Sequence, residues 1–516
     1  MENLIRNSNG NFGKTLLLEF FVVSLLLLAR IYKLDQTSVF DYDSAKNLLI
    51  IKEICAKDFQ NLFHHASPTF YLFLAPFYKL SENFLWLEYV CAFLSAVSIP
   101  LFGRLFQKYF KLNLLEYTLL LLFVGTTTFL VVSARNLAIE NVSLPIFALL
   151  LKTYISDEKT EWRKWKIICF WSALLFTINY KIIPFFLILL FLETLKSRTF
   201  EFKKWLFLGS SIFVFVGFYS FLSWVLGIDS LLYLKNIYAQ AFVKDMNPAK
   251  ELSNFNWDVF FYLKYIRDFE NPILWLGWAI LLYFSRKEFV TLLNRTVSKN
   301  KKVVFFQTEV LGITASCFVC GMSVLVKAPR GLLFAYPLIF CLAFVGLSKL
   351  LRNDFLKVAI FILAIGYNFW NLERFVYQYS ETNYPIVAKY LKEKGIKSLF
   401  TSVGLGITPF LSQEITHENL FSLKEMEEKN PTKSYLLLDD YWKIAQLGEF
   451  KKLERFSEIK WEEKSLQSPY LYLELCEFTG SSYEEAIEQW KQSEENTYLR
   501  LLSISLRRDF APQIGK

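Results

Sequence analysis

Long apolar runs recur along most of this chain, and they constrain its fold more than any other feature. A helix needs about 20 mostly apolar residues to cross a bilayer. Residues 1–372 contain many such runs, whereas residues 373–516 have the composition of an ordinary soluble sequence. The eleven predicted spans are 15–31, 85–103, 115–134, 138–155, 166–179, 182–195, 205–225, 271–285, 306–326, 331–348 and 356–372. The sequence therefore predicts a polytopic α-helical membrane domain followed by a small α/β domain.

The net charge of +9 excludes little by itself, because the basic residues lie mainly in short loops between the apolar runs. In a soluble protein such a charge would suggest nucleic acid as a partner. Here we expect membrane lipids as partners and no nucleic acid. The seven cysteines are scattered and do not indicate a disulfide framework.

Lys and Arg gather in alternate loops, and this asymmetry predicts the orientation of the chain. Cytoplasmic loops of membrane proteins are enriched in these residues. Here the basic clusters are 104–111, 159–166, 196–204, 286–302 and 349–357. With these loops inside, the N-terminus lies inside as an uncleaved signal anchor. Loops 32–84 and 226–270 and the domain 373–516 then lie outside, and a bacterial inner membrane is the simplest location.

Only a few basic residues fall in the short outer turns, and each needs a reason to be there. They are Arg135, Lys181, Lys327 and Arg330. One interpretation is that they reach lipid headgroups along the membrane surface. The other is that they form a cationic clamp for a phosphate at the outer leaflet. Glu140 begins the fourth span and either pairs with Arg135 or lines the same pocket.

The first outer loop opens on an aspartate pair, Asp41 and Asp43. A helix is predicted over Ala45–Cys55, with its apolar residues opposite Lys46 and other charged side chains, so that it lies in the interface plane. His64 and His65 follow. A second helix is predicted over Thr69–Lys79, since Pro68 is tolerated in a first turn.

Carboxylates beside a membrane pocket with nearby cations suit transfer from a lipid-linked phosphate. A carboxylate can orient and deprotonate an acceptor hydroxyl or amine, and Lys or Arg can stabilise the departing phosphate. Structural alternatives remain open. Asp43 can instead cap a helix that begins near Ser44, and His64 and His65 can be solvated loop residues.

Several short motifs resemble those of GT-C glycosyltransferases, in particular the protein mannosyltransferase and aminoarabinose transferase group. Phe40–Leu49 and Ser67–Tyr78 are similar to the family's first outer loop. Lys181, after a polar turn between two short spans, is similar to its T-K-G element. Ala328–Pro337, which includes Tyr336, is similar to its P-R-Y-x-L-P element. The resemblance covers most of the chain.

The resemblance implies a GT-C fold and an inverting hexosyl- or pentosyltransferase of the cell envelope. Its donor would be a polyprenyl-phosphate sugar, and its acceptor a lipid, a glycan or a protein. The catalytic aspartate carries over to Asp43, with Asp41 as a second acid. The substrate-binding residues carried over or placed beside the motifs are Lys181, Arg330, Arg135, His64, His65, Tyr336, Lys327 and Glu140.

The chain departs from the family pattern at two points. Ser44 stands in place of the second acid, and His64, His65 and Ala66 occupy the region of a family lysine. A protonated histidine would replace the charge of that lysine, and a neutral one would hydrogen-bond instead. No cofactor is certain, and a divalent cation, Mg²⁺ or Mn²⁺, held by Asp41 and Asp43 stays open.

Two other function classes compete with an enzyme. One is a non-catalytic GT-C-like scaffold, which the two departures keep open. The other is a lipid or sugar-lipid transporter, which usually shows charges or Gly/Pro breaks near mid-span in paired halves. We find no such pairing in the sequence.

The C-terminal region contains predicted helices and short buried strands in alternation. Helices are expected over Tyr384–Lys394, Ser482–Gln492 and Glu494–Leu506, and strands over Ser398–Val403, Ser434–Leu438 and Tyr470–Leu475.

The charge asymmetry makes the topology testable with reporter fusions. We expect fusions at residues 60 and 450 to report the outer side and a fusion at residue 295 to report the cytoplasm. A cytoplasmic signal at residue 450 would contradict both the count of spans and the placement of the C-terminal domain.

Overall fold

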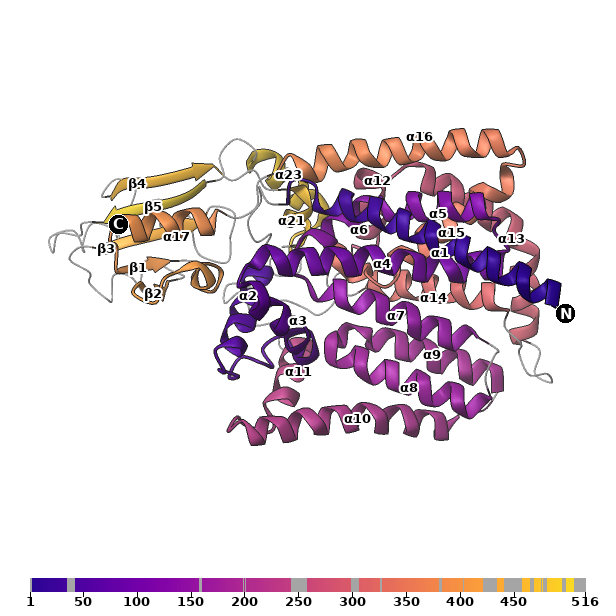
Figure 1. Ribbon diagram of the computed structural model, residues 1–516, viewed down its shortest axis with the longest axis horizontal. Coiled ribbons are helices and arrows are strands. Elements are labelled where there is room, and N and C mark those ends of the chain that lie inside the picture. Colours follow the sequence, from indigo (N-terminus) through magenta and orange to yellow (C-terminus); the bar gives the residue numbers. More distant parts are fainter. Residues whose placement is uncertain are drawn as a thin grey trace.

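The protein is an elongated helical bundle with a small β-sheet at one end (Figure 1). The N-terminus lies at the end of the bundle away from the sheet. The computed structural model describes residues 2–34, 42–156, 160–197, 199, 201–242, 258–297, 306–324, 327–379, 383–401, 403–420, 434–439, 457–464, 468–474, 476, 480–493 and 498–504.

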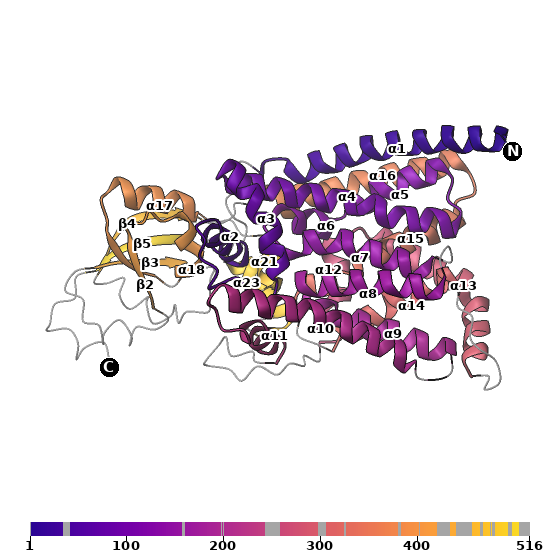
Figure 2. The same cartoon turned by 60° about the horizontal axis from the view of Figure 1, so that its bottom comes forward.

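The long helices run side by side along the bundle (Figure 2). They are α1 (Glu2–Ile31), α4 (Phe84–Phe110), α5 (Leu114–Gly125), α7 (Ile139–Ile155), α8 (Glu161–Ile178), α9 (Ile183–Ser197), α10 (Phe202–Val225), α13 (Ile273–Val297), α14 (Gln307–Met322), α15 (Tyr336–Leu350) and α16 (Asp354–Leu372). Each of the eleven predicted apolar runs falls on one of these helices, so their helical character is confirmed.

The predicted count of eleven spans is not confirmed. Among the described residues, three helical stretches are long and apolar enough to cross a membrane: α4, α10 and Asp354–Tyr377, in which α16 continues into the π-helical turn η5 (Glu373–Tyr377). The third predicted run makes a fourth only if its two halves, bent by 67°, count as one span.

The bend in the third run has a visible cause. The chain leaves α5 at Gly125 and restarts as the short helix α6 (Thr128–Val132), which is followed by the 3-10 turn η2 (Ser133–Arg135). Buried Glu270, from the loop before α13, accepts hydrogen bonds from the backbone N–H groups of Thr128 and Phe129 at 3.0 and 2.7 Å. These groups have no partner within their own helix, so a carboxylate stabilises the new start.

Helix α15 lies in the core of the bundle, and every residue from Tyr336 to Ser348 is buried. It packs against α13 through a pair of glycines. A Cβ atom added at Gly346 would lie 1.9 Å from the Gly277 carbonyl oxygen, so only glycine allows this approach. Just before α15 comes the 3-10 turn η4 (Pro329–Leu332), whose position is therefore set by a rigid, buried helix.

Helices α2 (Tyr42–Cys55), α3 (Pro68–Ser81) and α11 (Leu232–Phe242) lie at the end of the bundle nearest the sheet, and α12 (Phe261–Phe269) lies further along the bundle (Figure 1). Helix α3 begins at Pro68, and this confirms the predicted helix. The helix predicted over Ala45–Cys55 is present as part of α2, but the prediction that Lys46 lies on its exposed face is wrong, because Lys46 is only 7% exposed. The reason is that α18 (Gly404–Ile407) and η6 (Thr408–Phe410) pack onto α2, and Lys52 donates to the Pro409 carbonyl.

The C-terminal sheet has five strands in the order β2-β1-β3-β5-β4. The strands are β1 (Ser398–Thr401), β2 (Thr416–Asn419), β3 (Ser434–Asp439), β4 (Ser457–Lys464) and β5 (Tyr498–Ile504). Strand β1 is parallel to both β2 and β3, with Phe400 opposite Leu436, and β5 is antiparallel to β3 and β4, with Leu437 opposite Leu501. Helix α17 (Tyr384–Glu393) packs beside the sheet (Figure 1).

Four of the six elements predicted for this region are confirmed in type, including the helices α17 and α23 (Tyr483–Ser493), and two are wrong. The strands predicted at Ser398 and Ser434 are present, but the run predicted as a strand from Tyr470 is the helix α21 (Pro469–Glu474). A short apolar run does not by itself distinguish a strand from a buried helix. The helix predicted over Glu494–Leu506 is instead β5, because antiparallel partners on both sides supply its hydrogen bonds.

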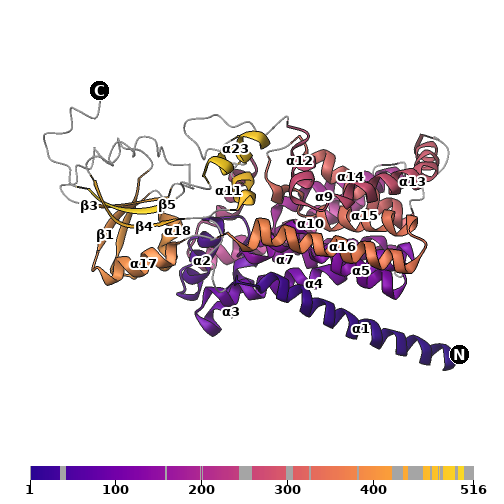
Figure 3. The ribbon, with the colours of Figure 1, turned by 90° about the horizontal axis from the view of Figure 1, so that it is seen from above.

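Helices α21 and α23 (Tyr483–Ser493) form an excursion between the neighbouring strands β4 and β5. Seen from above, the excursion lies against the bundle beside α12 and away from the sheet (Figure 3). It contacts η4, and Tyr483 donates to Asp268 of α12. The predicted domain boundary at residues 372 and 373 stays a prediction, since in space this excursion belongs with the bundle.

Candidate active site

The centre of the candidate site is a chain of three charged side chains from three distant segments. Arg330 Nη1, on η4, donates to Asp43 Oδ2, in the first turn of α2, at 2.8 Å. Arg330 Nε lies 3.0 Å from Glu474 Oε2, at the end of α21, and the Arg330 backbone N–H donates to Glu474 Oε1 at 2.9 Å. The side chains of Asp43, Arg330 and Glu474 are 29, 17 and 10% exposed.

Asp43 lies in the first turn of α2, and its carboxylate pairs with Arg330. Helix α2 is fixed by its neighbours. Buried Asn47 donates to the Leu137 carbonyl at 2.8 Å and accepts a hydrogen bond from Tyr71 of α3 at 2.9 Å. Because these contacts hold the helix on two sides, the carboxylate one turn earlier has a defined direction.

The pKa of Asp43 follows from two opposing effects. Burial by itself raises the pKa of this carboxyl, but the surrounding charges, first that of Arg330, outweigh burial and hold the pKa well below its usual range. Asp43 is therefore ionised near neutral pH. The titratable and charged groups around it are Lys46 on α2, His64 and His65 in the following loop, Tyr71 on α3 and Arg330 on η4.

Lys46 is a member of the site that the sequence interpretation placed on the opposite, exposed face. It follows Asp43 by three residues, which puts both on one face of α2. Among the described residues it has neither a hydrogen bond nor an ion pair, although burial lowers the pKa of its ammonium group and Asp43 partly opposes this. A buried ammonium group without a close counter-ion is costly, and an anion bound beside it would offset the cost.

His64 and His65 lie close to Asp43 and Lys46, in the loop between α2 and α3. Burial lowers the pKa of His64 to about 4 and holds the pKa of His65 well below its usual value. Both rings are therefore neutral near neutral pH. Among the described residues, the Nε2 atom of each is buried without a hydrogen-bond partner. The geometry favours neutral hydrogen-bonding histidines over a protonated replacement for the family lysine.

Lys327 and Tyr336 flank Arg330 in sequence but face other neighbours. Lys327 Nζ donates to the Met322 carbonyl at 3.1 Å and lies over the ring of Tyr262 on α12. Burial lowers the pKa of Lys327 to about 8, and Asp258 partly opposes this shift. The ring of Tyr336 is buried against Phe129, with centroids 4.0 Å apart.

The structure gives Arg135 a local task that the sequence interpretation did not predict. Its buried guanidinium donates to the carbonyls of Arg30 and Tyr32, at 2.8 and 2.6 Å, and lies over the ring of Tyr377. It thereby satisfies carbonyls at the end of α1, which have no partner within the helix. Among the described contacts Arg135 forms no ion pair with Glu140, which is buried in the first turn of α7.

Lys181 lies in the 3-10 turn η3 (Tyr180–Ile182) between α8 and α9, and its backbone N–H donates to Asn179 Oδ1 at 3.1 Å. This turn is at the same end of the bundle as α3, because Thr177 of α8 contacts Thr69 of α3 at 2.6 Å between their hydroxyl oxygens. Its predicted role in phosphate binding stays a prediction.

Asp41, the second predicted acid, lies outside the described residues. Within the part of the chain that is described, no group of three or more His, Cys, Asp or Glu side chains is placed to hold a metal ion. The divalent cation considered for Asp41 and Asp43 therefore stays a prediction.

No protein-family model matches the sequence, and no curated protein matches it significantly. Solved structures do match the fold, and two of them are structures of one protein. ArnT from Cupriavidus metallidurans in the apo state superposes with a TM-score of 0.53 at 12% identity, covering 85% of this chain and 95% of that one. The same protein bound to undecaprenyl phosphate gives a TM-score of 0.53 at 11% identity, with the same coverage. The chain has the GT-C fold.

The GT-C fold confirms the resemblance on which the sequence interpretation rested, and two site residues were still missed. The sequence did indicate that Lys46 could belong to the site, because its three-residue spacing from Asp43 places both residues on one helix face. Glu474 had none. It is 144 residues from Arg330 in sequence, and it lies in a segment that was predicted to be a strand.

We expect Arg330→Ala to move the titration of the Asp43 carboxyl to higher pH, because burial would then act with less opposition. In the wild type the pKa of Asp43 is lower in the folded state than in the unfolded state. The stabilisation from the ion pair is therefore fully present above the unfolded-state pKa, about 3.9. It is lost as pH falls through the folded-state pKa. In the variant the carboxyl would already protonate at higher pH. Carbon NMR of aspartate-labelled protein, assigned with Asp43→Asn, measures this titration.

The matched control is Arg267→Ala, which removes an exposed arginine paired with Asp268 on α12. It should leave the Asp43 signal unchanged. An Asp43 titration that is the same in Arg330→Ala and in the wild type would contradict the electrostatic role of the pair.

Proposed function

We propose that this protein is a membrane glycosyltransferase that moves a sugar from a polyprenyl-phosphate donor to an acceptor. The observation that carries the proposal is the contact between Asp43 and Arg330, with buried Lys46 beside it, at one end of a GT-C bundle. The likeness to ArnT bound to undecaprenyl phosphate supports a polyprenyl-phosphate lipid as the donor class. The acceptor is a lipid, a glycan or a protein.

The donor phosphate meets two cations in this arrangement. A phosphate diester between a sugar and a polyprenol carries one negative charge, and the departing monoester gains a second as the glycosidic bond breaks. Lys46 makes no hydrogen bond or ion pair with the described residues, although Asp43 lies near it, and Arg330 can present a fork of donors to phosphate oxygens. Charge that develops on the leaving oxygen is thus stabilised in a partly buried site, where such contacts are strong.

While Arg330 holds its charge, Asp43 is a weak base. An anionic donor phosphate competes with the Asp43 carboxylate for Arg330 Nη1. When the phosphate takes this donor, burial again dominates and the pKa of Asp43 rises. We infer that donor binding activates Asp43, so that the base becomes effective only when the leaving group is in place.

The transfer step follows from these roles. The acceptor oxygen or nitrogen attacks the anomeric carbon from the side opposite the phosphate, and its proton passes to the Asp43 carboxylate. The bond between the anomeric carbon and the phosphate oxygen breaks, and that oxygen keeps the electron pair as polyprenyl phosphate leaves. The neutral His64 and His65 can donate hydrogen bonds to sugar or acceptor oxygens. The configuration at the anomeric carbon is inverted.

We further propose a multi-pass location in a bacterial inner membrane, with the site and the C-terminal sheet on the outer face. The basic loops support this orientation. The sheet and α2 lie together at the end of the bundle opposite the N-terminus, as the orientation requires (Figure 1).

A non-catalytic scaffold is the second candidate, because an ion pair that already joins Asp43, Arg330 and Glu474 is also what a purely structural role would produce. The two functions differ in what Asp43→Asn does to transfer.

We expect Asp43→Asn to lower turnover by about 10²–10⁴-fold, the range for loss of a positioned general base. The amide keeps the size and the hydrogen bonding of the side chain but cannot accept the proton. The measurement is sugar transfer from a polyprenyl-phosphate donor in detergent or vesicles. Asp58→Asn, in the same outer loop but exposed, is the matched control and should remain active. Asp41→Asn should cost less than Asp43→Asn, and the reverse order would exchange their roles.

We expect Lys46→Met to raise the KM for the donor more than the KM for the acceptor. Methionine fills a similar volume but removes the charge, and a charge-assisted contact contributes about 1.5–3 kcal/mol, or roughly 10- to 150-fold in binding. Lys52→Met, two turns further along α2, removes a lysine that donates to the Pro409 carbonyl and serves as the control. Equal effects of both substitutions on the donor would argue against a phosphate contact at Lys46.

A further inference from the structure

Glu474 reaches the candidate site by an unusual path. Strands β4 and β5 are antiparallel neighbours, yet the chain between them leaves the sheet and packs α21 against η4 of the bundle. Residues Pro469 to Glu474 are all buried there, and Glu474 ends the helix. A sheet of this kind needs only a short turn at this point, so the excursion needs a separate explanation.

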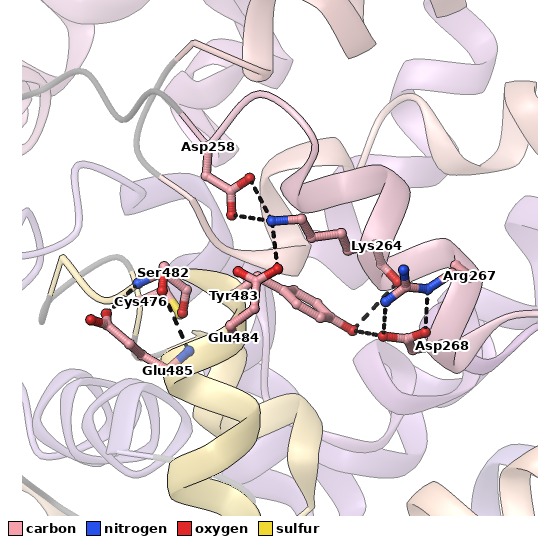
Figure 4. A network of polar contacts seen from close by, with 9 residues as sticks. All are labelled: Asp258, Lys264, Arg267, Asp268, Cys476, Ser482, Tyr483, Glu484 and Glu485. Atoms are coloured by element: carbon pink, nitrogen blue, oxygen red, sulfur yellow. Dashed lines mark hydrogen bonds and ion pairs between the residues drawn. The ribbon is translucent and has the colours of Figure 1, made fainter.

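The excursion is fastened to the bundle on both sides of Glu474. Before α21, buried Ser468 donates to the Phe375 carbonyl at 2.7 Å. After it, the hydroxyl of Tyr483 donates to Asp268 at 2.7 Å, and Lys264 Nζ lies 2.8 Å from the Glu484 carboxylate (Figure 4).

Lys264 also holds Asp258 at 3.0 Å, so one lysine of α12 joins the outer loop to α23 (Figure 4). The side chain of Tyr483 lies between the Lys264–Asp258 ion pair and the Arg267–Asp268 ion pair (Figure 4). The place of α21 is thus determined by polar contacts at its two ends and by its own burial.

The contact with Arg330 is made at two points. Glu474 Oε1 accepts from the backbone N–H of Arg330, and Oε2 lies against Nε of its guanidinium. These two points hold both the backbone and the guanidinium of Arg330, and Asp43 contacts its Nη1. A free arginine side chain has many rotamers, and holding one of them has an entropic cost at the moment of binding.

We propose that Glu474 is a positioning residue for transfer: it holds Arg330 in place while Nη1 of that arginine passes from Asp43 to the donor phosphate. This inference rests on the proposed function. It makes α21, from the far C-terminal part of the chain, a component of the active site. The contact with Glu474 persists through this exchange, and it opposes the pull of Asp43 and of the phosphate on the guanidinium.

The first test compares Glu474→Gln with Glu484→Gln. The first substitution keeps one acceptor oxygen but removes the charge at Nε, and the second removes a contact that only docks the excursion. We expect Glu474→Gln to lower kcat by about 10²-fold, the usual cost of a misplaced catalytic group, with a smaller change in the donor KM. Glu474→Asp restores the charge and should recover part of the loss. Glu484→Gln should transfer as the wild type does.

The second test does not depend on transfer. The carboxyl titration of Asp43, followed by carbon NMR in the full-length protein, should move to still lower pH in Glu474→Gln, because a neighbouring negative charge is lost and Asp43 then draws Arg330 to itself. Glu474→Asp should move it less, and this variant serves for both tests if Glu474→Gln does not fold. Glu484→Gln should not move it.

The outcomes separate the two proposals. An Asp43 titration that shifts to lower pH in a protein without any transfer would support the positioning of Arg330 and overturn the glycosyltransferase. Suppose instead that the wild type transfers sugar, and that Glu474→Gln is equally active with an unchanged Asp43 titration. That result would support the glycosyltransferase and overturn the positioning role of Glu474. Equal losses in Glu474→Gln and Glu484→Gln would also overturn it, since docking of the excursion would then explain both.

Discussion

One arginine shared by two carboxylates links the parts of this structure that matter most. Arg330 is 287 residues from Asp43 and 144 from Glu474, and it contacts both. Buried ion pairs are weak evidence of stability, because removing charges from water offsets much of their attraction. Their geometry is specific, however, and removal of one partner leaves an uncompensated charge. The contacts of Arg330 therefore define how α2, the turn η4 before the core helix α15, and the C-terminal excursion meet.

The depressed pKa of Asp43 gives this arrangement a chemical meaning. A carboxylate held by a guanidinium is ionised but weakly basic, which is unsuitable for general-base catalysis until the cation is drawn away. Under the proposed function, an anionic donor would draw it away, and buried Lys46 would offer the same phosphate a second positive charge. Substrate binding and activation of the base are then one event, and it depends on Arg330 remaining in position.

The C-terminal region shows why sequence predictions lose accuracy where distant contacts decide structure. The helices at Tyr384 and Ser482 and the strands at Ser398 and Ser434 have local signals, and they are present. The segment after Glu494 has a mixed pattern, and only its pairing with β3 and β4 makes it a strand. The run after Pro469 is equally ambiguous, and burial against the bundle makes it a helix.

The sequence alone determined the helical character of the bundle, the two short motifs that contain Asp43 and Arg330, and their resemblance to a GT-C family, because periodicity and local motifs are properties of neighbouring residues. Tertiary structure decided which cations face Asp43. Arg135 looked available but serves the end of α1, whereas Lys46 looked solvated but is buried. Glu474 enters the site only through packing of an excursion from the sheet. Such contacts join segments hundreds of residues apart, and no local pattern encodes them.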